Sequence, residues 1–194
     1  MLDQKTHPKD TMERELLEIA RNSIKSRVEG RDFEVPEAIR QRFSERVGVF
    51  TTVTKDGALR GCIGFMLPVY PLWEAVKESA ILSVTEDPRF PPVTENELSG
   101  LGIELTLLGT LEKLDLKPGT SRQNISIGEE GLYMTDGIRS GLLLPQVATE
   151  NGFSEQEFIT ETAYKAGIDP DRVFSGTVEV YKFSARVINE TSSE

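Results

Sequence analysis

The sequence contains very little of the two side chains on which many enzyme sites depend. Its 194 residues include one histidine, His7, and one cysteine, Cys62. A Ser-His or Cys-His catalytic pair and an ordinary zinc site with several imidazoles both need a histidine inside the fold. Because His7 lies in the polar N-terminal stretch, before the first helical pattern, we expect neither such a catalytic pair nor such a zinc site. The sequence has no EF-hand spacing for a carboxylate site, and no residue is assigned to a metal.

Other absences concern the compartment of the protein. A single cysteine cannot form an internal disulfide, which fits a reducing cytoplasm. The chain has no run of about 18 apolar residues, so we expect no segment that spans a membrane. Residues 1–10 are polar and lack the apolar stretch of a secretory signal. The sequence therefore predicts a cytoplasmic protein that makes no membrane contact.

Basic residues are also in the minority, with 22 Lys and Arg against 32 Asp and Glu, a net charge of −10 and a pI near 4.8. Such a chain repels polyphosphate at long range, which opposes nucleic-acid binding. No glycine-rich phosphate motif follows a strand pattern. We expect a small molecule or a protein as the partner and no nucleic acid, and the sequence points to no particular cofactor.

The spacing of apolar residues changes several times along the chain. Three- and four-residue spacing predicts helices over about 11–29, 71–84, 145–151 and 155–166, with a short one after Pro36. Alternation and two Asp-Gly turns predict strands over about 48–54, 58–65, 101–112, 132–135, 138–144 and 175–187. This mixture predicts an α+β fold, an antiparallel β-sheet flanked by helices.

We expect the whole chain, residues 1–194, to form one domain with two less regular segments. A flexible leader is expected over residues 1–9. The loop over 115–124 is rich in Pro, Gly, Ser and Asn, and it is the candidate linker between a larger and a smaller subdomain. No internal repeat or low-complexity tract divides the chain further.

The segment Leu59-Arg60-Gly61-Cys62-Ile63-Gly64 is unusual for a strand. Strand alternation places Arg60, Cys62 and Gly64 on one face, and its glycines fit the close approach of a ligand or of another backbone. A thiol that shares a face with a guanidinium group can have a lowered pKa and react as a thiolate. The alternative is structural: Cys62 is a small buried hydrophobe, Arg60 pairs with a carboxylate, and the glycines form a bulge.

Two further segments present polar groups. In Asp87-Pro88-Arg89-Phe90-Pro91-Pro92, three prolines hold the loop extended and present Asp87 and Arg89 in set directions. The alternative is a rigid connector with an Asp–Arg pair and Phe90 in the core. In Gly141-Leu142-Leu143-Leu144-Pro145-Gln146-Val147, a strand runs into a helix N-terminus, whose free N–H groups bind either an anion or only water.

These segments carry a resemblance to a known family. The pieces Leu59 to Gly64, Asp87-Pro88-Arg89-Phe90, Leu143 to Ala148 and Lys165-Ala166-Gly167 occur in the order and spacing of the AMMECR domain family. The chain therefore resembles a prokaryotic AMMECR-type protein over most of its length. The resemblance implies an α+β fold with a larger and a smaller subdomain, an intracellular protein, and a cleft lined by the Arg-Gly-Cys segment.

The resemblance also implies a setting for the function. Prokaryotic members of the family are linked with a Memo-type, dioxygenase-like protein and with a radical S-adenosylmethionine protein, which implies a shared modification pathway. This sequence departs from the pattern at Phe153-Ser154, where relatives often carry tryptophan, and at Thr162-Ala163, where similar sequences often carry cysteine. Cys62 is left as the only thiol, which opposes a two-cysteine redox or metal site.

The functional hypothesis is a protein that binds a small molecule or a partner in a cleft around Cys62, as a component of that pathway. If the protein is an enzyme, Cys62 is the candidate nucleophile, Arg60 the group that binds an anion and stabilises the thiolate, and Asp87 the candidate base. The candidate ligand-binding residues are Gly61, Gly64 and Arg89. The alternative is a non-catalytic module that docks a protein partner on the same face.

Overall fold

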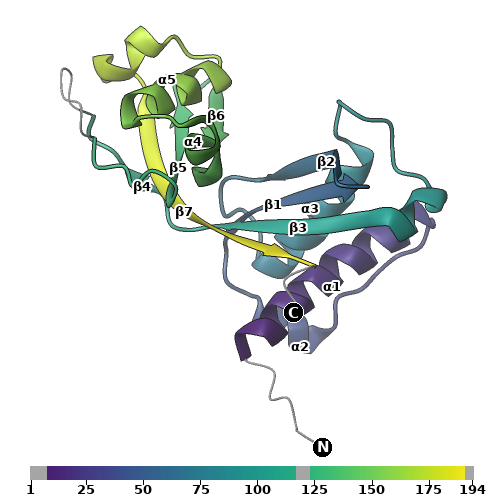
Figure 1. Cartoon of the computed structure of the whole chain (residues 1–194). Helices are drawn as coiled ribbons and strands as arrows, with labels where there is room; N and C mark the ends of the chain where they lie inside the picture. Colours follow the sequence, from purple (N-terminus) through teal and green to yellow (C-terminus); the bar gives the residue numbers. More distant parts are fainter. Residues whose placement is uncertain (1–7, 117–122, 191–194) are drawn as a thin grey trace, which may run out of the picture. The chain divides into compact units, whose positions relative to one another are not determined.

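The computed structural model describes residues 8–116 and 123–190 of the chain (Figure 1). Helices pack on antiparallel strands, which confirms the predicted α+β fold. The chain divides into a larger unit, Met1–Leu108 with Arg186–Glu194, and a smaller unit, Gly109–Ala185. Among the described residues, no helix is both long enough and apolar enough to cross a membrane.

The larger unit is built on antiparallel strands in the order β2-β1-β3: β1 (Gly48–Lys55), β2 (Ala58–Phe65) and β3 (Leu101–Leu108). Strand β7 (Glu179–Asn189) follows β3 in this order, which leaves β2 at the edge. β1 and β2 meet in a two-residue turn, Asp56-Gly57, with φ angles of 51° and 78°. Two successive positive φ angles are typical of the tight hairpin turn that an Asp-Gly pair favours.

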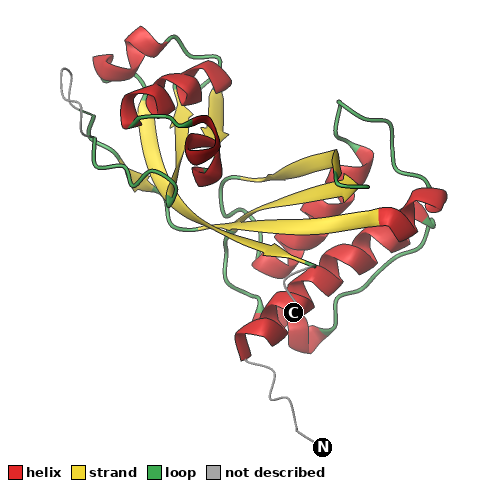
Figure 2. Ribbon diagram, viewed as in Figure 1, coloured by secondary structure: helices red, strands yellow, loops and turns green. Residues whose placement is uncertain are grey.

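Helices cover one face of this sheet (Figure 2). They are α1 (Pro8–Val28), α2 (Glu37–Arg42) and α3 (Leu72–Thr85), with the 3-10 helix η1 (Glu95–Gly100) before β3. Helix α3 packs on β1 and β2, and helix α1 packs on α3 and β3. The core lies between these layers, and its fully buried side chains include Ile24, Phe43, Val49, Val76 and Leu105.

The smaller unit has its own sheet and its own core. Its strands are β4 (Glu112–Lys113), β5 (Glu130–Thr135), β6 (Ser140–Leu143) and the first part of β7, which pairs with both β4 and β5. Its helices are α4 (Pro145–Asn151), α5 (Glu155–Lys165) and the 3-10 helix η2 (Pro170–Ser175). The fully buried side chains of this core include Leu132, Met134, Phe158 and Ala163.

Most predicted elements are present with slightly shifted ends, but two strands differ more. The strand predicted over 101–112 ends before Gly109, whose N–H group donates instead to Ser184 O at 2.7 Å. The strand predicted over 175–187 is β7, which begins and ends nearer the C-terminus. It begins late because the residues before it form η2, whose first turn is capped by the Asp169 side chain.

The two irregular segments predicted from composition lie partly outside the described residues. Of the leader predicted over 1–9, the last two residues begin α1 and the others lie outside the described residues. Of the linker predicted over 115–124, residues 117–122 lie outside the described residues. The division between the units falls after Leu108 and within β7. The linker over 115–124 therefore stays a prediction, located inside the smaller unit.

Candidate functional site

A bulge in β2 sets the face of the sheet on which Cys62 lies. Strict pairing from the two-residue turn would bring Cys62 opposite Thr51. The register shifts by one residue, with Arg60 left over in β2, so that Cys62 lies opposite Thr52 instead. A shift of one residue moves a side chain to the other face of a sheet. The bulge at Arg60 therefore determines where the thiol points.

The face that carries Cys62 is the one without helices. Thr51 points to α3, because its hydroxyl group hydrogen bonds to Ser79 Oγ at 2.7 Å. Gly61 also faces α3, because a Cβ atom built on it would lie 1.9 Å from a carbonyl oxygen of that helix. Successive residues of a strand point to opposite faces, so Thr52 and Cys62 lie on the helix-free face. There Thr52 Oγ1 donates a hydrogen bond to Cys62 Sγ at 3.4 Å.

The loop after α3 pairs with the free edge of β2 at Cys62. Asp87 Oδ2 accepts a hydrogen bond from Cys62 N–H at 2.8 Å, and Arg89 Nη2 donates one to Cys62 O at 3.4 Å. The Asp87 side chain, 3% exposed, also accepts from Arg89 Nε at 2.9 Å and from Nη2 at 2.6 Å. Asp87 and Arg89 thus pair both polar backbone groups of Cys62, as a neighbouring strand would.

The charges of this cluster stabilise one another. The pKa of Asp87 is held well below its usual value, chiefly by the hydrogen bond from the Arg89 side chain, with burial acting in the opposite direction. The pKa of Arg89 is raised, first by the hydrogen bond to Asp87 and in smaller part by the Cys62 side chain. Asp87 is therefore held ionised and is a weak proton acceptor. Its role as a base stays a prediction that this geometry does not favour.

Arg60 is held by a different carboxylate. Its Nε and Nη2 atoms donate to Glu97 at 2.9 and 3.2 Å, and its Nη1 atom donates to Pro91 O at 2.9 Å. This pairing lowers the pKa of Glu97 to about 2, with the Arg60 hydrogen bond as the largest cause. The bulge interrupts the expected alternation at Arg60. The guanidinium group that contacts Cys62 is that of Arg89, at the backbone oxygen.

Two arginines contact the aromatic ring of Phe90, in the loop that carries Asp87 and Arg89. The guanidinium carbon of Arg60 lies 5.9 Å from the centre of the Phe90 ring, and that of Arg89 lies 5.5 Å from it. Both distances are within the range of cation–π attraction. Phe90 is half-buried rather than enclosed in the core, so it serves as a contact between the two arginines.

Packing within the larger unit accounts for both glycines of the segment. A Cβ atom on Gly61 would lie 1.9 Å from Ser83 O, and one on Gly64 would lie 2.2 Å from Val49 O. Neither position can accept a side chain unless the backbone moves, because the close atoms belong to the main chain. The ligand-binding roles of Gly61, Gly64 and Arg89 stay predictions.

Two side chains of the helix-free face were missed by the sequence analysis. Thr52 lies opposite Cys62 on one side and opposite Glu104 of β3 on the other. Opposite residues of adjacent strands share a face, so the three form one row across β2, β1 and β3. Burial raises the pKa of Glu104. The Asp-Gly turn predicts that β1 pairs with β2. Without the bulge, this pairing would bring Cys62 opposite Thr51 instead of Thr52.

The third predicted segment lies in the smaller unit. As expected, strand β6 leads into helix α4, which begins at Pro145. Gly141 allows β6 to approach the end of α5, since a Cβ atom on it would lie 2.6 Å from Cα of Ala166, the residue directly after that helix. Anion binding at the start of α4 stays a prediction.

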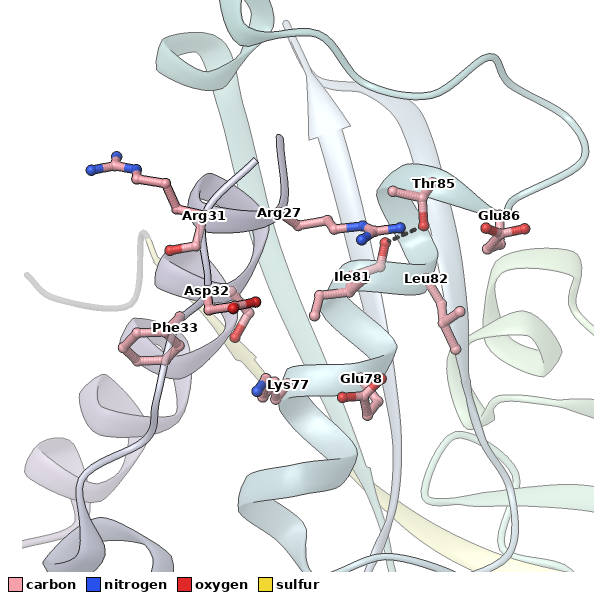
Figure 3. Close-up of a pocket in the computed structure, with 12 residues that line it drawn as sticks. Arg27, Arg31, Asp32, Phe33, Lys77, Glu78, Ile81, Leu82, Thr85 and Glu86 are labelled. Atoms are coloured by element: carbon pink, nitrogen blue, oxygen red, sulfur yellow. Dashed lines mark hydrogen bonds between the residues drawn. The ribbon is translucent and has the colours of Figure 1, made fainter. Parts of the chain in front are cut away.

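A pocket of about 400 Å³ lies elsewhere in the larger unit, between α1 and α3 (Figure 3). Charged groups of both signs line it, among them Arg27, Asp32 and Lys77. Figure 3 shows the Arg27 side chain crossing from α1 toward the last turn of α3. None of the residues predicted for the site lines this pocket. Within residues 8–116 and 123–190, no three His, Cys, Asp or Glu side chains are placed to hold a metal ion.

Comparison with known proteins identifies the family. The sequence pattern of AMMECR1 matches residues 17–188. The chain belongs to the AMMECR1 family. Relatives include a protein of Thermococcus onnurineus, 42% identical over 181 residues that cover 90% of this chain and 88% of that protein. Another is Protein NEQ441 of Nanoarchaeum equitans, 40% identical over 177 residues that cover 90% of this chain and 98% of that protein.

A solved structure is similar to this AMMECR1-family chain as well. It is the crystal structure of the uncharacterised protein PH0010 from Pyrococcus horikoshii, which is 40% identical in sequence. The TM-score is 0.84, and the match covers 93% of this chain and 92% of that chain. The family predicted from the four sequence pieces is thereby confirmed, and so is the fold class.

Proposed function

We propose that this AMMECR1-family protein binds a small molecule at the helix-free face of its larger unit, with Cys62 as a nucleophilic thiolate. The observation that carries the proposal is the pairing of both backbone polar groups of Cys62 by Asp87 and Arg89. This pairing holds the thiol in one place and brings a cation beside it. A neighbouring guanidinium group favours the thiolate over the thiol.

Arg89 takes the role that the sequence analysis expected of Arg60. Its side chain is 52% exposed, and its Nη1 atom makes none of the contacts with Asp87 and Cys62. That nitrogen atom is available to an anionic group of a ligand. Arg60 supports the site indirectly, because it hydrogen bonds to Pro91 of the same loop.

The resemblance to prokaryotic AMMECR-type proteins extends the proposal to a pathway. In this setting the protein acts in the cytoplasm, together with a Memo-type protein and a radical S-adenosylmethionine protein, on a shared modification. Co-purification of the tagged chain with these two proteins tests the association. Recovery of neither protein, from cells that contain both, would contradict it.

The chemical test is alkylation of Cys62 by iodoacetamide in the folded protein across pH, followed by mass spectrometry. We expect Cys62 to be labelled in the folded protein, and the midpoint of its pH profile is compared between variants. Arg89→Met is expected to raise the midpoint, and Arg89→Lys to raise it less. Arg139→Met is the matched control, because it removes a guanidinium group paired with Asp136 in the smaller unit. Labelling that begins only on unfolding would contradict the proposal.

The second candidate function is a non-catalytic module that docks a protein partner. It is favoured by a run of exposed apolar side chains directly after β2, where Leu67, Val69 and Tyr70 are 50%, 50% and 37% exposed. Contiguous exposed apolar groups are typical of protein contact sites. A partner whose binding is lost with Val69→Asp and kept with Cys62→Ala would favour this function over the first.

A further inference from the structure

The row of side chains across β2, β1 and β3 has a charge at each end. At one end Arg89 lies beside Cys62, where its Nη2 atom donates to Cys62 O at 3.4 Å. At the other end is Glu104, opposite Thr52, which itself lies opposite Cys62. Neighbouring strands are about 4.8 Å apart, so about 10 Å separates the backbones of Cys62 and Glu104.

The Glu104 carboxylate lacks the compensation that nearby acidic groups have. Asp87 pairs with Arg89, and Glu97 pairs with Arg60. Within the described residues, the Glu104 carboxylate takes part in no hydrogen bond or ion pair, and burial is the cause that raises its pKa. A partly buried charge without a partner is unfavourable until an opposite charge reaches it.

The charged side chains on the elements around Glu104 are engaged elsewhere. Arg186 of β7 pairs with a glutamate of α1. Glu190, which follows β7, pairs with Arg21. Lys55 of β1 lies 3.5 Å from a glutamate of η1. No described residue therefore neutralises the charge on Glu104, and a group from outside the chain can do so.

An apolar side chain lies along the same face. Phe50 of β1 is opposite Gly64 of β2, in the row next to that of Cys62. Its ring leans over the glycine, since its Cδ1 atom would lie 2.6 Å from a Cβ atom built on Gly64. The face therefore offers a cation, a thiol and an anion in one row, with an aromatic surface beside it.

We propose that the ligand of this site is a bipolar small molecule, whose anionic group binds Arg89 and whose cationic group binds Glu104. Its apolar middle lies across Cys62 and Thr52 and contacts Phe50. An extended zwitterion with its charges several bonds apart, such as an ω-amino acid, belongs to this class. The inference rests on the proposed function, because it needs Cys62 to be accessible in the folded protein.

The test compares the rates at which two charged methanethiosulfonate reagents modify Cys62. The thiolate attacks the reagent, a disulfide bond forms, and methanesulfinate leaves with the bonding electron pair. The 2-aminoethyl reagent is a cation and the 2-sulfonatoethyl reagent is an anion, and both rates are divided by those for N-acetylcysteine. We expect the cation-to-anion ratio to fall about fivefold in Glu104→Gln, the effect of one nearby charge in a partly hydrated site.

Matched variants separate the charge of Glu104 from general effects. Glu104→Asp keeps the charge and is expected to keep most of the ratio, whereas Arg89→Met is expected to raise it. Glu112→Gln removes an exposed carboxylate of β4 and is expected to leave the ratio unchanged. An unchanged ratio in folded Glu104→Gln would overturn the bipolar ligand and leave the proposed function intact. Failure of both reagents to modify the folded wild-type protein would overturn the proposed function itself.

Discussion

The backbone N–H group of Cys62 donates a hydrogen bond to Asp87 Oδ2 at 2.8 Å. The two residues belong to an edge strand and to the loop that follows the helix packed against it. Arg89 completes the contact at Cys62 O. Because these side chains occupy the edge of β2, a further strand cannot pair there. The position of the thiol is thereby tied to that of a charged loop.

Asp87→Asn is expected to lower the free energy of unfolding by about 2 kcal/mol at neutral pH, because asparagine loses the charge that pairs with Arg89. The folded-state pKa of Asp87 is lowered, so its contribution to stability is full above the unfolded pKa and is lost as pH falls toward the folded value. Urea denaturation at pH 7 and at low pH measures the difference between variant and wild type. The difference should shrink in acid.

The control for this variant is Asp115→Asn, which changes an exposed aspartate of the smaller unit. We expect it to change stability by less than about 0.5 kcal/mol at either pH. A loss in Asp87→Asn no larger than that in the control would show that the pairing with Cys62 and Arg89 contributes little to stability.

Gly61→Ala is expected to cost about 3 kcal/mol of stability, because the new methyl group would lie 1.9 Å from Ser83 O in the main chain of α3. Gly100→Ala is the matched control, since a Cβ atom there meets nothing within 4 Å. Chemical denaturation measures the free energy of unfolding of both variants. Equal stability of the two variants would mean that α3 and β2 do not approach each other this closely.

Glu104→Gln is expected to stabilise the protein at neutral pH. Burial raises the folded-state pKa of Glu104 above its ordinary value, near 4.5. Between the two values the folded state holds more protons, so stability falls as pH rises through this window. Glutamine removes this loss of stability. The gain in stability of Glu104→Gln over the wild type should therefore disappear below pH 4. Thermal unfolding at pH 3.5 and pH 7 measures it, and a variant less stable at pH 7 would contradict the prediction.

Arg60→Met and Glu97→Gln are each expected to cost about 1–2 kcal/mol, because each breaks the same pair of charged hydrogen bonds. The double variant should cost less than the sum of the single ones. Urea denaturation of the wild type and all three variants gives the coupling energy between Arg60 and Glu97. Arg40 and Glu37, an exposed pair at 3.1 Å, serve as the control cycle, where coupling below about 0.5 kcal/mol is expected. Equal coupling in the two cycles would contradict the prediction.

The same Arg60→Met variant distinguishes the two arginines at the site. Its guanidinium group contacts Glu97 and Pro91, whereas that of Arg89 contacts Cys62 O. The alkylation midpoint of Cys62 should therefore move less in Arg60→Met than in Arg89→Met. A larger shift in Arg60→Met would restore the role that the sequence analysis expected.

Much of the fold could be predicted because its signals are local. The Asp56-Gly57 turn and the alternation around it are enough to specify the β1–β2 hairpin. Ser154 and Glu157, three residues apart, form a capping box at the start of α5. Strand ends were harder to predict. The strand from Leu101 ends where the chain meets Ser184, a residue far away in the sequence.

The candidate site shows the same limit more sharply. Local sequence was enough to select Cys62, Asp87 and Arg89. A single cysteine in a glycine-containing strand, and an Asp–Arg loop that contains prolines, can both be recognised from the sequence. It could not specify the face of Cys62, because that depends on one unpaired residue in the pairing of β1 with β2. Packing also determined which arginine lies beside Cys62, and it placed Glu104 in the same row of side chains as Cys62. Such contacts join residues 25 or more positions apart, where the pattern of neighbouring residues carries no information.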